Sequence, residues 1–171
     1  TLSGDLTEIA WELGFGTSIV ARDVTTVFPP EAATLPIVGV GRFLRAEGVL
    51  KQEPTLVLGD TQTSPPEAIA QIRSAGVPVV IMDVPTSFEG LYRKIRDLGQ
   101  ALGVPDRGES LAMRVRAEVD EALSGAQQFS PPPGIAFVYS RGPDVMLLFG
   151  SGMTTRPLIE GAGGVDVGAA I

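Results

Sequence analysis

The chain has 171 residues, of which 44% are hydrophobic, and its 13 basic and 20 acidic side chains leave a formal charge of −7 at pH 7. That length suits one ordinary domain or two small lobes, and an acidic balance without a long basic run argues against a nucleic-acid partner. The sequence contains no cysteine and no histidine. Zinc sites built on these residues, thiolate nucleophiles and imidazole acid–base chemistry are therefore excluded within this chain.

The first half of the chain alternates short apolar runs with helical patterns, which is typical of a parallel α/β lobe. The opening residues read as the tail of a strand. The elements expected after it are a helix (6–13), a strand (19–21), a proline-rich loop (24–36), a strand–turn–helix–strand unit (37–60), a helix (64–76) and a strand (77–84). Ser64 is predicted to cap the later helix and Gly76 to close it. The β-branched run at 77–84 predicts a strand covered on both faces. Residues 1–85 thus form the expected first lobe.

Residues 86–129 are expected to be helical and to lead out of that lobe. A helix of about 20 residues is predicted from Ser110 through Gln128, and at 1.5 Å per residue it spans roughly 30 Å. A helix of this length can connect one lobe to another.

Residues 130–171 are expected to begin a second lobe. The segments 134–140 and 144–150 predict a hairpin, and a glycine turn and a helix over 154–162 follow. Two strands and a helix are too few for an independent α/β sheet, so we expect an incomplete lobe with an unpaired edge. Such an edge predicts self-association.

The unit at 37–60, IVGVGRFLRAEGVLKQEPTLVLGD, places a glycine turn and a lone arginine after an apolar strand. Backbone N–H groups beside Arg42 at such a turn suit an anionic ligand. Gly39 and Gly41 invite a dinucleotide-binding interpretation, but the third glycine position is Leu44, whose side chain obstructs close helix–strand packing. Arg42 either pairs with a ligand carboxylate or is a solvated arginine at a helix start.

Several segments resemble the substrate-binding proteins of heme ABC importers, within the larger group that binds cobalamin and iron-siderophores. The resemblance covers nearly the whole chain in order. The residues that carry it are DLTEIAWELGFGTSIVARDVTT (5–26), FPPEA (28–32), LPIVG (35–39), RFLRAEGVLKQEPTLVLGD (42–60), PPEAIAQIRSAGVPVV (65–80), FEGLYRKIRDLGQALGVPDRGESLA (88–112), FGSGMTT (149–155) and LIEGAGGVD (158–166).

The resemblance implies a class III binding-protein fold: a parallel-sheet first lobe, a long connecting helix and a second α/β lobe, with the ligand held between the lobes. It implies a binding protein rather than an enzyme, exported to the periplasm or the outer face of the cytoplasmic membrane. Glu47 matches the family's first-lobe glutamate that docks on the permease. The second docking glutamate of the family belongs to a part of the second lobe beyond Ile171.

The sequence departs from the family at one position. Typical heme-binding members carry an iron-ligating tyrosine directly after the glycine that ends LPIVG, and here that residue is Val40. The arginine that contacts the porphyrin and its propionates in the family is retained as Arg42. Three explanations stay open: another residue ligates the iron, heme binds without a ligand from this lobe, or the ligand is a different tetrapyrrole or chelate.

The leading hypothesis is therefore an ABC-importer component that binds heme as its transported ligand. The candidate ligand-binding residues are Val40, Gly41, Arg42 and Tyr139, although Tyr139, within a predicted strand, also suits simple packing. The alternatives are a siderophore or cobalamin receptor of the same superfamily and a dinucleotide-dependent enzyme.

Overall fold

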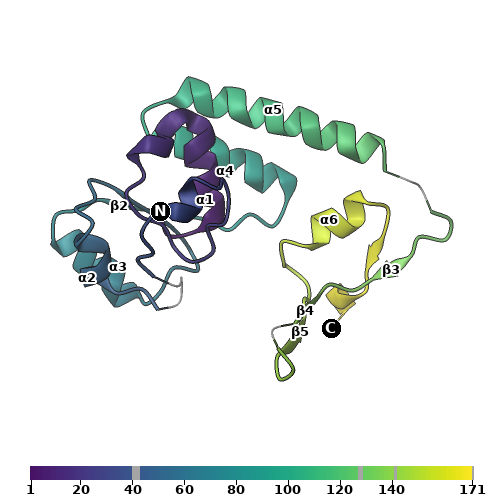
Figure 1. Ribbon diagram of the computed structural model, residues 1–171. Helices are drawn as coiled ribbons and strands as arrows, with labels where there is room; N and C mark the ends of the chain where they lie inside the picture. The colour runs from purple at the N-terminus through teal and green to yellow at the C-terminus, as the bar shows by residue number, and fades with distance from the viewer. Residues whose placement is uncertain (40–42, 127–128, 141, 171) are drawn as a thin grey trace. The chain divides into compact units, whose positions relative to one another are not determined.

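The structure is a computed structural model that describes residues 1–39, 43–126, 129–140 and 142–170. It divides into two compact units (Figure 1). Unit 1 contains Thr1–Val84 and Lys94–Leu111, and unit 2 contains Pro85–Arg93 and Ala112–Ile171.

Most helices and strands follow the expected order along the chain, but the strand expected at 19–21 is wrong, since only an isolated bridge between Arg22 and Ile37 forms near it, and β6 was not expected. Unit 1 begins with the helix α1, the π-helical turn η1 and the 3-10 turns η2 and η3, and it continues with α2, β1, α3 and β2. Their bounds are Gly4–Ala10 (α1), Trp11–Phe15 (η1), Gly16–Ser18 (η2), Ala32–Thr34 (η3), Ala46–Leu50 (α2), Val57–Asp60 (β1), Pro66–Ser74 (α3) and Val79–Met82 (β2). The helices α4 and α5 contribute to both units, and the remaining elements lie in unit 2, with the bounds Phe88–Ala101 (α4), Pro105–Ser124 (α5), Gly134–Ile135 (β3), Val138–Ser140 (β4), Met146–Leu148 (β5), Arg156–Gly161 (α6), Val165–Asp166 (β6) and Gly168–Ala170 (η4).

Unit 1 is built on a parallel sheet, as expected. β1 pairs with β2 in parallel, and Arg22 forms a parallel bridge with Ile37. The first two residues lie between these pairs, because the Thr1 amino group donates to Ala21 O at 2.9 Å and Leu2 N–H donates to Leu58 O at 2.8 Å. The sheet itself contains β1 and β2, and hydrogen bonds extend it through the chain start and 20–23 to 36–38.

The core of unit 1 lies between this sheet and the helices α2 and α3. It is a cluster of buried apolar side chains from the chain start, β1, α2 with the residue two positions before it, and α3: Leu2, Leu44, Ala46, Val49, Val57, Ala68, Ile69 and Ile72. Trp11 is half-buried, and its indole ring lies against Gly16, where a Cβ atom would come within 2.6 Å of the ring.

Three sequence predictions in these elements are wrong. Ser64 does not cap α3, because Pro65 is the N-cap residue and the Ser64 carbonyl accepts the Leu44 N–H instead. The long helix α5 begins at Pro105 rather than Ser110 and ends at Ser124, since proline suits the first helical position. β2 is not covered on both faces, because Ile81 is exposed and only Met82 of this strand is buried.

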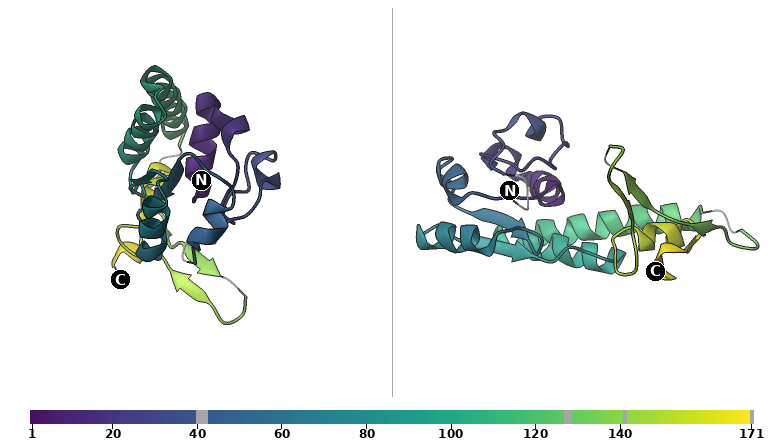
Figure 2. Two further views of the ribbon diagram at one scale, coloured as in Figure 1. Left: turned by 90° about the vertical axis from the view of Figure 1, so that its left-hand side faces the viewer. Right: turned by 90° about the horizontal axis from the view of Figure 1, so that it is seen from below.

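The helices α4 and α5 form an antiparallel hairpin, which the two views of Figure 2 show side by side. Gly99 and Gly108 let the helices approach closely, because a Cβ atom on Gly99 would lie 2.7 Å from Gly108 Cα. Arg96 pairs with Glu109 at 2.6 Å, and the Arg116 guanidinium lies 4.5 Å from the centroid of the buried Tyr92 ring.

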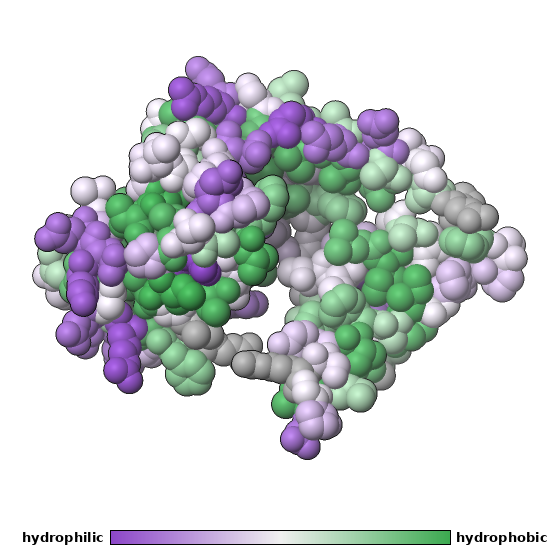
Figure 3. Space-filling model, viewed as in Figure 1, coloured by the Kyte–Doolittle hydropathy of each residue, from purple (hydrophilic) through white to green (hydrophobic). Residues whose placement is uncertain are grey.

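Unit 2 contains the expected hairpin. β4 pairs with β5 in antiparallel register, with Tyr139 opposite Leu147. β3 does not extend this hairpin but pairs in parallel with β6. In Figure 3, hydrophobic residues gather on the visible face of this unit, around α6 and the strands. Within the described residues, no helix is long and apolar enough to cross a membrane.

Candidate ligand-binding site

The loops that follow the strands of unit 1 lie along one edge of its sheet. This arrangement follows from the parallel pairing of β1 with β2 and of Arg22 with Ile37, since parallel strands end at a common edge. The carboxyl edge of an open parallel sheet is the usual position of a ligand site in α/β folds. The described residues at this edge are 24–31, Gly39, Phe43 and 61–65.

Backbone hydrogen bonds connect these loops to one another. Val24 N–H donates to Gly39 O at 3.1 Å, and Leu44 N–H donates to Ser64 O at 3.1 Å. Gly39 also packs against Leu44, because a Cβ atom at Gly39 would lie 3.0 Å from Leu44 Cδ1. Both ends of the glycine turn are therefore fixed to the sheet edge.

The surface of these loops is largely apolar. Phe43, directly after the turn, is 78% exposed. The strand ends and the proline-rich loop carry further exposed apolar side chains, namely Val24, Val27, Phe28 and Ile37. We call these five residues the apolar edge. Exposed apolar side chains that gather in one patch mark a binding surface, and these five come from neighbouring loops at one sheet edge.

The sequence prediction did not single out Phe28 and Phe43. Both are aromatic residues in segments read as loop or turn, where neither a helical nor a strand period requires a large apolar side chain. That mismatch between residue type and predicted element is the signal that could have identified them.

The cation that the structure describes at this edge has a structural role. The Arg22 guanidinium donates to the carbonyl oxygens of Asp23 and Thr26 at 3.1 and 3.0 Å, and it donates to Ala33 O as well. Because these bonds hold the proline-rich loop against the strand, Arg22 stabilises the shape of the edge.

The other predicted site residues fall in three places. Val40, Gly41 and Arg42 lie outside the described residues. Glu47 is exposed in the first turn of α2, in unit 1. Tyr139 belongs to β4 of unit 2.

Tyr139 is part of an aromatic group in unit 2. Its ring lies 6.4 Å from that of Phe149 and nearly parallel to it, and Phe149 lies 4.9 Å from Phe137. All three contribute to the surface of the unit, and Tyr139 is 42% exposed. Its ring is therefore available for contact with a flat ligand while packing on one side.

The geometry does not favour a dinucleotide cradle. α2 has only five residues and begins at Ala46, after Leu44, whose side chain is buried in the core. Asp60, the acidic residue in the ribose-binding position, accepts hydrogen bonds from Gln62 N–H and the Thr63 hydroxyl within its own loop. Among the described residues, no group of three or more carboxylates is placed to hold a metal ion.

A family model described as a periplasmic binding protein matches residues 1–171. The chain belongs to this family. Solved structures of periplasmic binding proteins superpose closely on it. The periplasmic heme-binding protein RhuT from Roseiflexus sp. RS-1, in apo form, is 44% identical with a TM-score of 0.91, over 96% of this chain and 63% of that one.

Two further relatives differ in what their names say they bind. The periplasmic heme-binding protein BhuT, solved in complex with two hemes, is 34% identical with a TM-score of 0.86, over 96% of this chain and 65% of that one. The vitamin B12-binding protein of Pectobacterium atrosepticum is 25% identical over 121 residues, 71% of this chain and 43% of that protein. The chain spans about half the length of the curated periplasmic binding proteins it matches. The fold class expected from the sequence is thereby confirmed.

Proposed function

We propose that this chain is part of the substrate-binding component of an ABC importer, which captures heme or a related tetrapyrrole and delivers it to a membrane permease. The protein acts outside the cytoplasmic membrane, in the periplasm or on the outer face of that membrane. The observation that carries the proposal is the apolar edge at the carboxyl end of the parallel sheet, in a chain 44% identical to a heme-binding protein of the same fold.

The apolar edge suits a flat, largely hydrophobic ligand. Phe43 and Phe28 offer aromatic faces on which a macrocycle stacks, and burial of such surface contributes about 25 cal/mol per Å². Arg42 follows the glycine turn in the sequence, and we assign it to a propionate carboxylate. Tyr139, Val40 and Gly41 complete the proposed ligand contacts.

The lobes are assigned from the sequence pattern. We propose that residues 1–85 form the first lobe and 130–171 the start of the second, and that 86–129, containing α5, connects them. We also expect the 171-residue chain to self-associate through the exposed strands of unit 2, and a light-scattering mass equal to that of one 17.9 kDa chain would contradict this.

Titration with three ligands tests the proposed function and addresses the role of iron. Hemin, metal-free protoporphyrin IX and cyanocobalamin are each added to the purified chain, and binding is followed by the absorption of the ligand and by quenching of Trp11. We expect hemin to bind with a changed Soret band and cyanocobalamin to bind at least about tenfold more weakly, a difference of about 1.4 kcal/mol. Preference for cyanocobalamin would assign the chain to the cobalamin branch, and no binding of any of the three would reject the proposal.

The comparison of hemin with protoporphyrin IX separates the explanations for Val40. Equal affinities mean that the macrocycle and its propionates carry the binding. A preference of tenfold or more for hemin means that a residue other than Val40 ligates the iron. The matched pair Arg42→Gln and Arg73→Gln then tests the propionate contact, since Arg73 is an exposed arginine of α3 that donates to Val79 O. We expect Arg42→Gln, but not Arg73→Gln, to weaken the binding of both hemin and protoporphyrin IX by about tenfold.

A further inference from the structure

Two charged side chains adjoin the carboxyl edge of the unit 1 sheet without taking part in any contact described so far. Arg45 lies two residues after Phe43 of the apolar edge, and Asp83 directly follows Met82, the last residue of β2. Both are exposed, and neither forms a side-chain hydrogen bond or ion pair within the part of the chain that the structure describes. Their charges are therefore available to a ligand at this edge.

Arg45 stands beside Phe43 on the same side of the chain. It is the N-cap residue of α2, and its backbone is extended, with φ −115° and ψ 123°. Side chains alternate between the two sides of an extended segment. Leu44 is buried in the core, whereas Phe43 and Arg45 on either side of it are exposed. The guanidinium is thus placed to meet a carboxylate of a flat ligand that stacks on the Phe43 ring.

A short turn, residues 61–65, separates this position from the end of β2. Leu44 N–H donates to Ser64 O at 3.1 Å, and Thr61 N–H donates to Met82 O at 2.9 Å. Both ends of the turn are therefore bonded to the segments that carry the two charges. Because each charged residue lies one position beyond a bonded residue, the arginine and the aspartate flank the same turn.

Asp83 follows the face of the sheet on which this turn lies. Side chains alternate along β2, and Met82 is buried while Ile81 and Asp83 are exposed. A Cβ atom at Gly59 would lie 3.1 Å from Ile81 Cδ1 and 3.0 Å from Thr63 Oγ1, so Ile81 shares a face with the turn. The Asp83 carboxylate, two residues further on, continues along that face.

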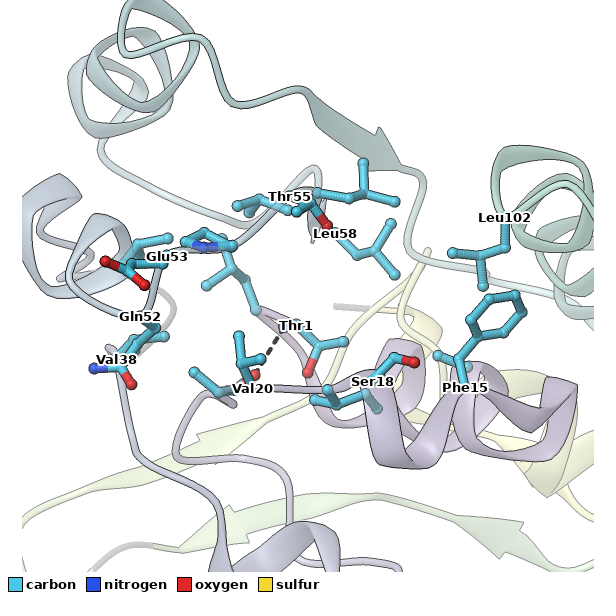
Figure 4. Close-up of a pocket in the computed structure, with 18 of the residues that line it drawn as sticks. Thr1, Phe15, Ser18, Val20, Val38, Gln52, Glu53, Thr55, Leu58 and Leu102 are labelled. Atoms are coloured by element: carbon cyan, nitrogen blue, oxygen red, sulfur yellow. Dashed lines mark hydrogen bonds between the residues drawn. The ribbon is translucent and has the colours of Figure 1, made fainter.

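The cavity inside unit 1 offers no comparable pair of charges. It has a volume of about 480 Å³, and Figure 4 shows Glu53 among its lining residues, together with Phe15, Val38 and Leu102. Of the described residues that line it, Glu53 alone has a charged side chain. A ligand that carries carboxylates is repelled by this group, and the carboxyl edge with Arg45 suits it better.

We propose that Arg45 binds a carboxylate of the ligand and that Asp83 sets the orientation of the ligand, so that this edge takes a flat macrocycle with carboxylates on one side only. The inference rests on the proposed function and specifies its ligand. The two propionates of heme lie next to each other on the ring and meet Arg42 and Arg45. The opposite side of the ring, which carries the vinyl groups, extends over the turn toward Asp83.

A macrocycle with carboxylates all round its rim fits this arrangement poorly. Whichever way it is turned, one of its carboxylates lies beside Asp83, where like charges repel. The position of the two charges therefore predicts discrimination between porphyrins that share the same ring and metal.

Two iron porphyrins that differ in their carboxylates test the proposal. Hemin carries two propionates, and iron(III) coproporphyrin III carries two more in place of the vinyl groups. Dissociation constants for both are measured by absorption titration with the unchanged chain, Arg45→Gln, Arg45→Lys and Asp83→Asn. Arg73→Gln and Asp97→Asn are the matched controls, because they make the same charge changes at exposed positions of α3 and α4.

We expect the unchanged chain to prefer hemin by at least about fivefold, and Asp83→Asn to lose most of this preference by binding the coproporphyrin more tightly. Arg45→Gln should weaken both ligands by about fivefold, and Arg45→Lys should recover most of that loss, because it keeps the charge. Both effects should shrink in about 0.5 M salt, which screens exposed charges. A loss of folded structure would not change the preference between the two porphyrins in this way.

The outcomes separate this proposal from the proposed function. If the unchanged chain binds the two porphyrins equally, or if Asp83→Asn keeps the full preference for hemin, the proposal is overturned while heme binding stands. Unchanged affinities in Arg45→Gln would overturn the assignment of Arg45 to a carboxylate. Binding of neither porphyrin by the unchanged chain would reject the proposed function and this proposal together.

Discussion

In a chain that starts at Thr1, the amino group of this residue is buried within unit 1, where burial lowers its pKa from 8.0 to about 6 despite the partly compensating charge of Asp23. Its folded-state pKa lies below the unfolded value, so between pH 6 and 8 the unfolded chain binds a proton that the folded chain does not. The free energy of unfolding therefore rises with pH across this window, by about 2 kcal/mol.

Chemical denaturation of the 171-residue chain at pH 6, 7 and 8 measures this dependence. The absence of histidine and cysteine makes the window unusually clean, because neither imidazole nor thiol groups titrate there. Acetylation of the amino group is the control, and it should flatten the profile. A flat profile for the unmodified chain would contradict the burial of the ammonium.

Val40 offers a second prediction at the level of a single side chain. A tyrosine phenolate is an established heme-iron ligand, whereas valine has no donor atom. We expect Val40→Tyr to change the Soret band of bound hemin and to strengthen hemin binding, without a comparable change for protoporphyrin IX. Val40→Phe adds the ring without the oxygen and is the matched control. Equal spectra for the two variants would mean that position 40 does not reach the iron.

At the scale of elements, the contact between α4 and α5 depends on two glycines. A methyl group on Gly99 would lie 2.7 Å from Gly108 Cα, so the helices would have to move apart. We expect Gly99→Ala to lower stability by about 1 to 3 kcal/mol, or roughly 2 to 4 °C in thermal midpoint for each kcal/mol.

Gly90→Ala is the control within the same helix. Its Cβ atom would lie 3.2 Å from Ser87 Oγ, which accepts the Gly90 N–H at 3.0 Å, so a small shift of this one side chain is enough and the helices need not move apart. Since alanine favours helix more than glycine does, we expect this variant to be neutral or slightly stabilising. Equal losses in the two variants would mean that the helix contact is not the cause.

Sequence patterns predicted most of these elements but not the caps and hydrogen bonds at their ends. The helical period and glycine stops located α1, α3 and α4, and the hairpin of β4 and β5 was expected from two apolar runs. The cap at Ser64 was wrong because α3 begins at Pro66, which makes Pro65 the N-cap residue. The Ser64 carbonyl accepts the Leu44 N–H, a contact 20 residues apart in sequence. Contacts of that kind have no local signature.

The candidate site was predictable to a similar extent. The 37–60 unit was expected to present a ligand at the end of its first strand, since a strand followed by a glycine turn has a local pattern, and the described ends of this turn, Gly39 and Leu44, are hydrogen-bonded to Val24 and Ser64. The apolar edge was missed because exposure of Phe43 depends on how three separate loops meet.

At the scale of the whole molecule, the proposed delivery of ligand requires a docking contact separate from the ligand site. Glu47 is exposed on α2, five residues beyond Arg42 in sequence, and we assign it to a basic pocket of the permease. A carboxylate that pairs with an arginine contributes through a charge-assisted hydrogen bond, which a reversed charge converts to repulsion.

Glu47→Lys should therefore leave hemin affinity unchanged and reduce heme uptake, or stimulation of the transporter ATPase, by at least about tenfold. Glu67→Lys is the matched control, because Glu67 is also exposed and also lies in the first turn of a helix of unit 1, so both variants lose the same favourable interaction with a helix N-terminus. Equal loss of transport in both variants would trace the effect to net charge, and a loss of hemin affinity in Glu47→Lys would place this residue at the ligand instead. Loss of transport only in Glu47→Lys, with binding intact, separates capture from delivery in this molecule.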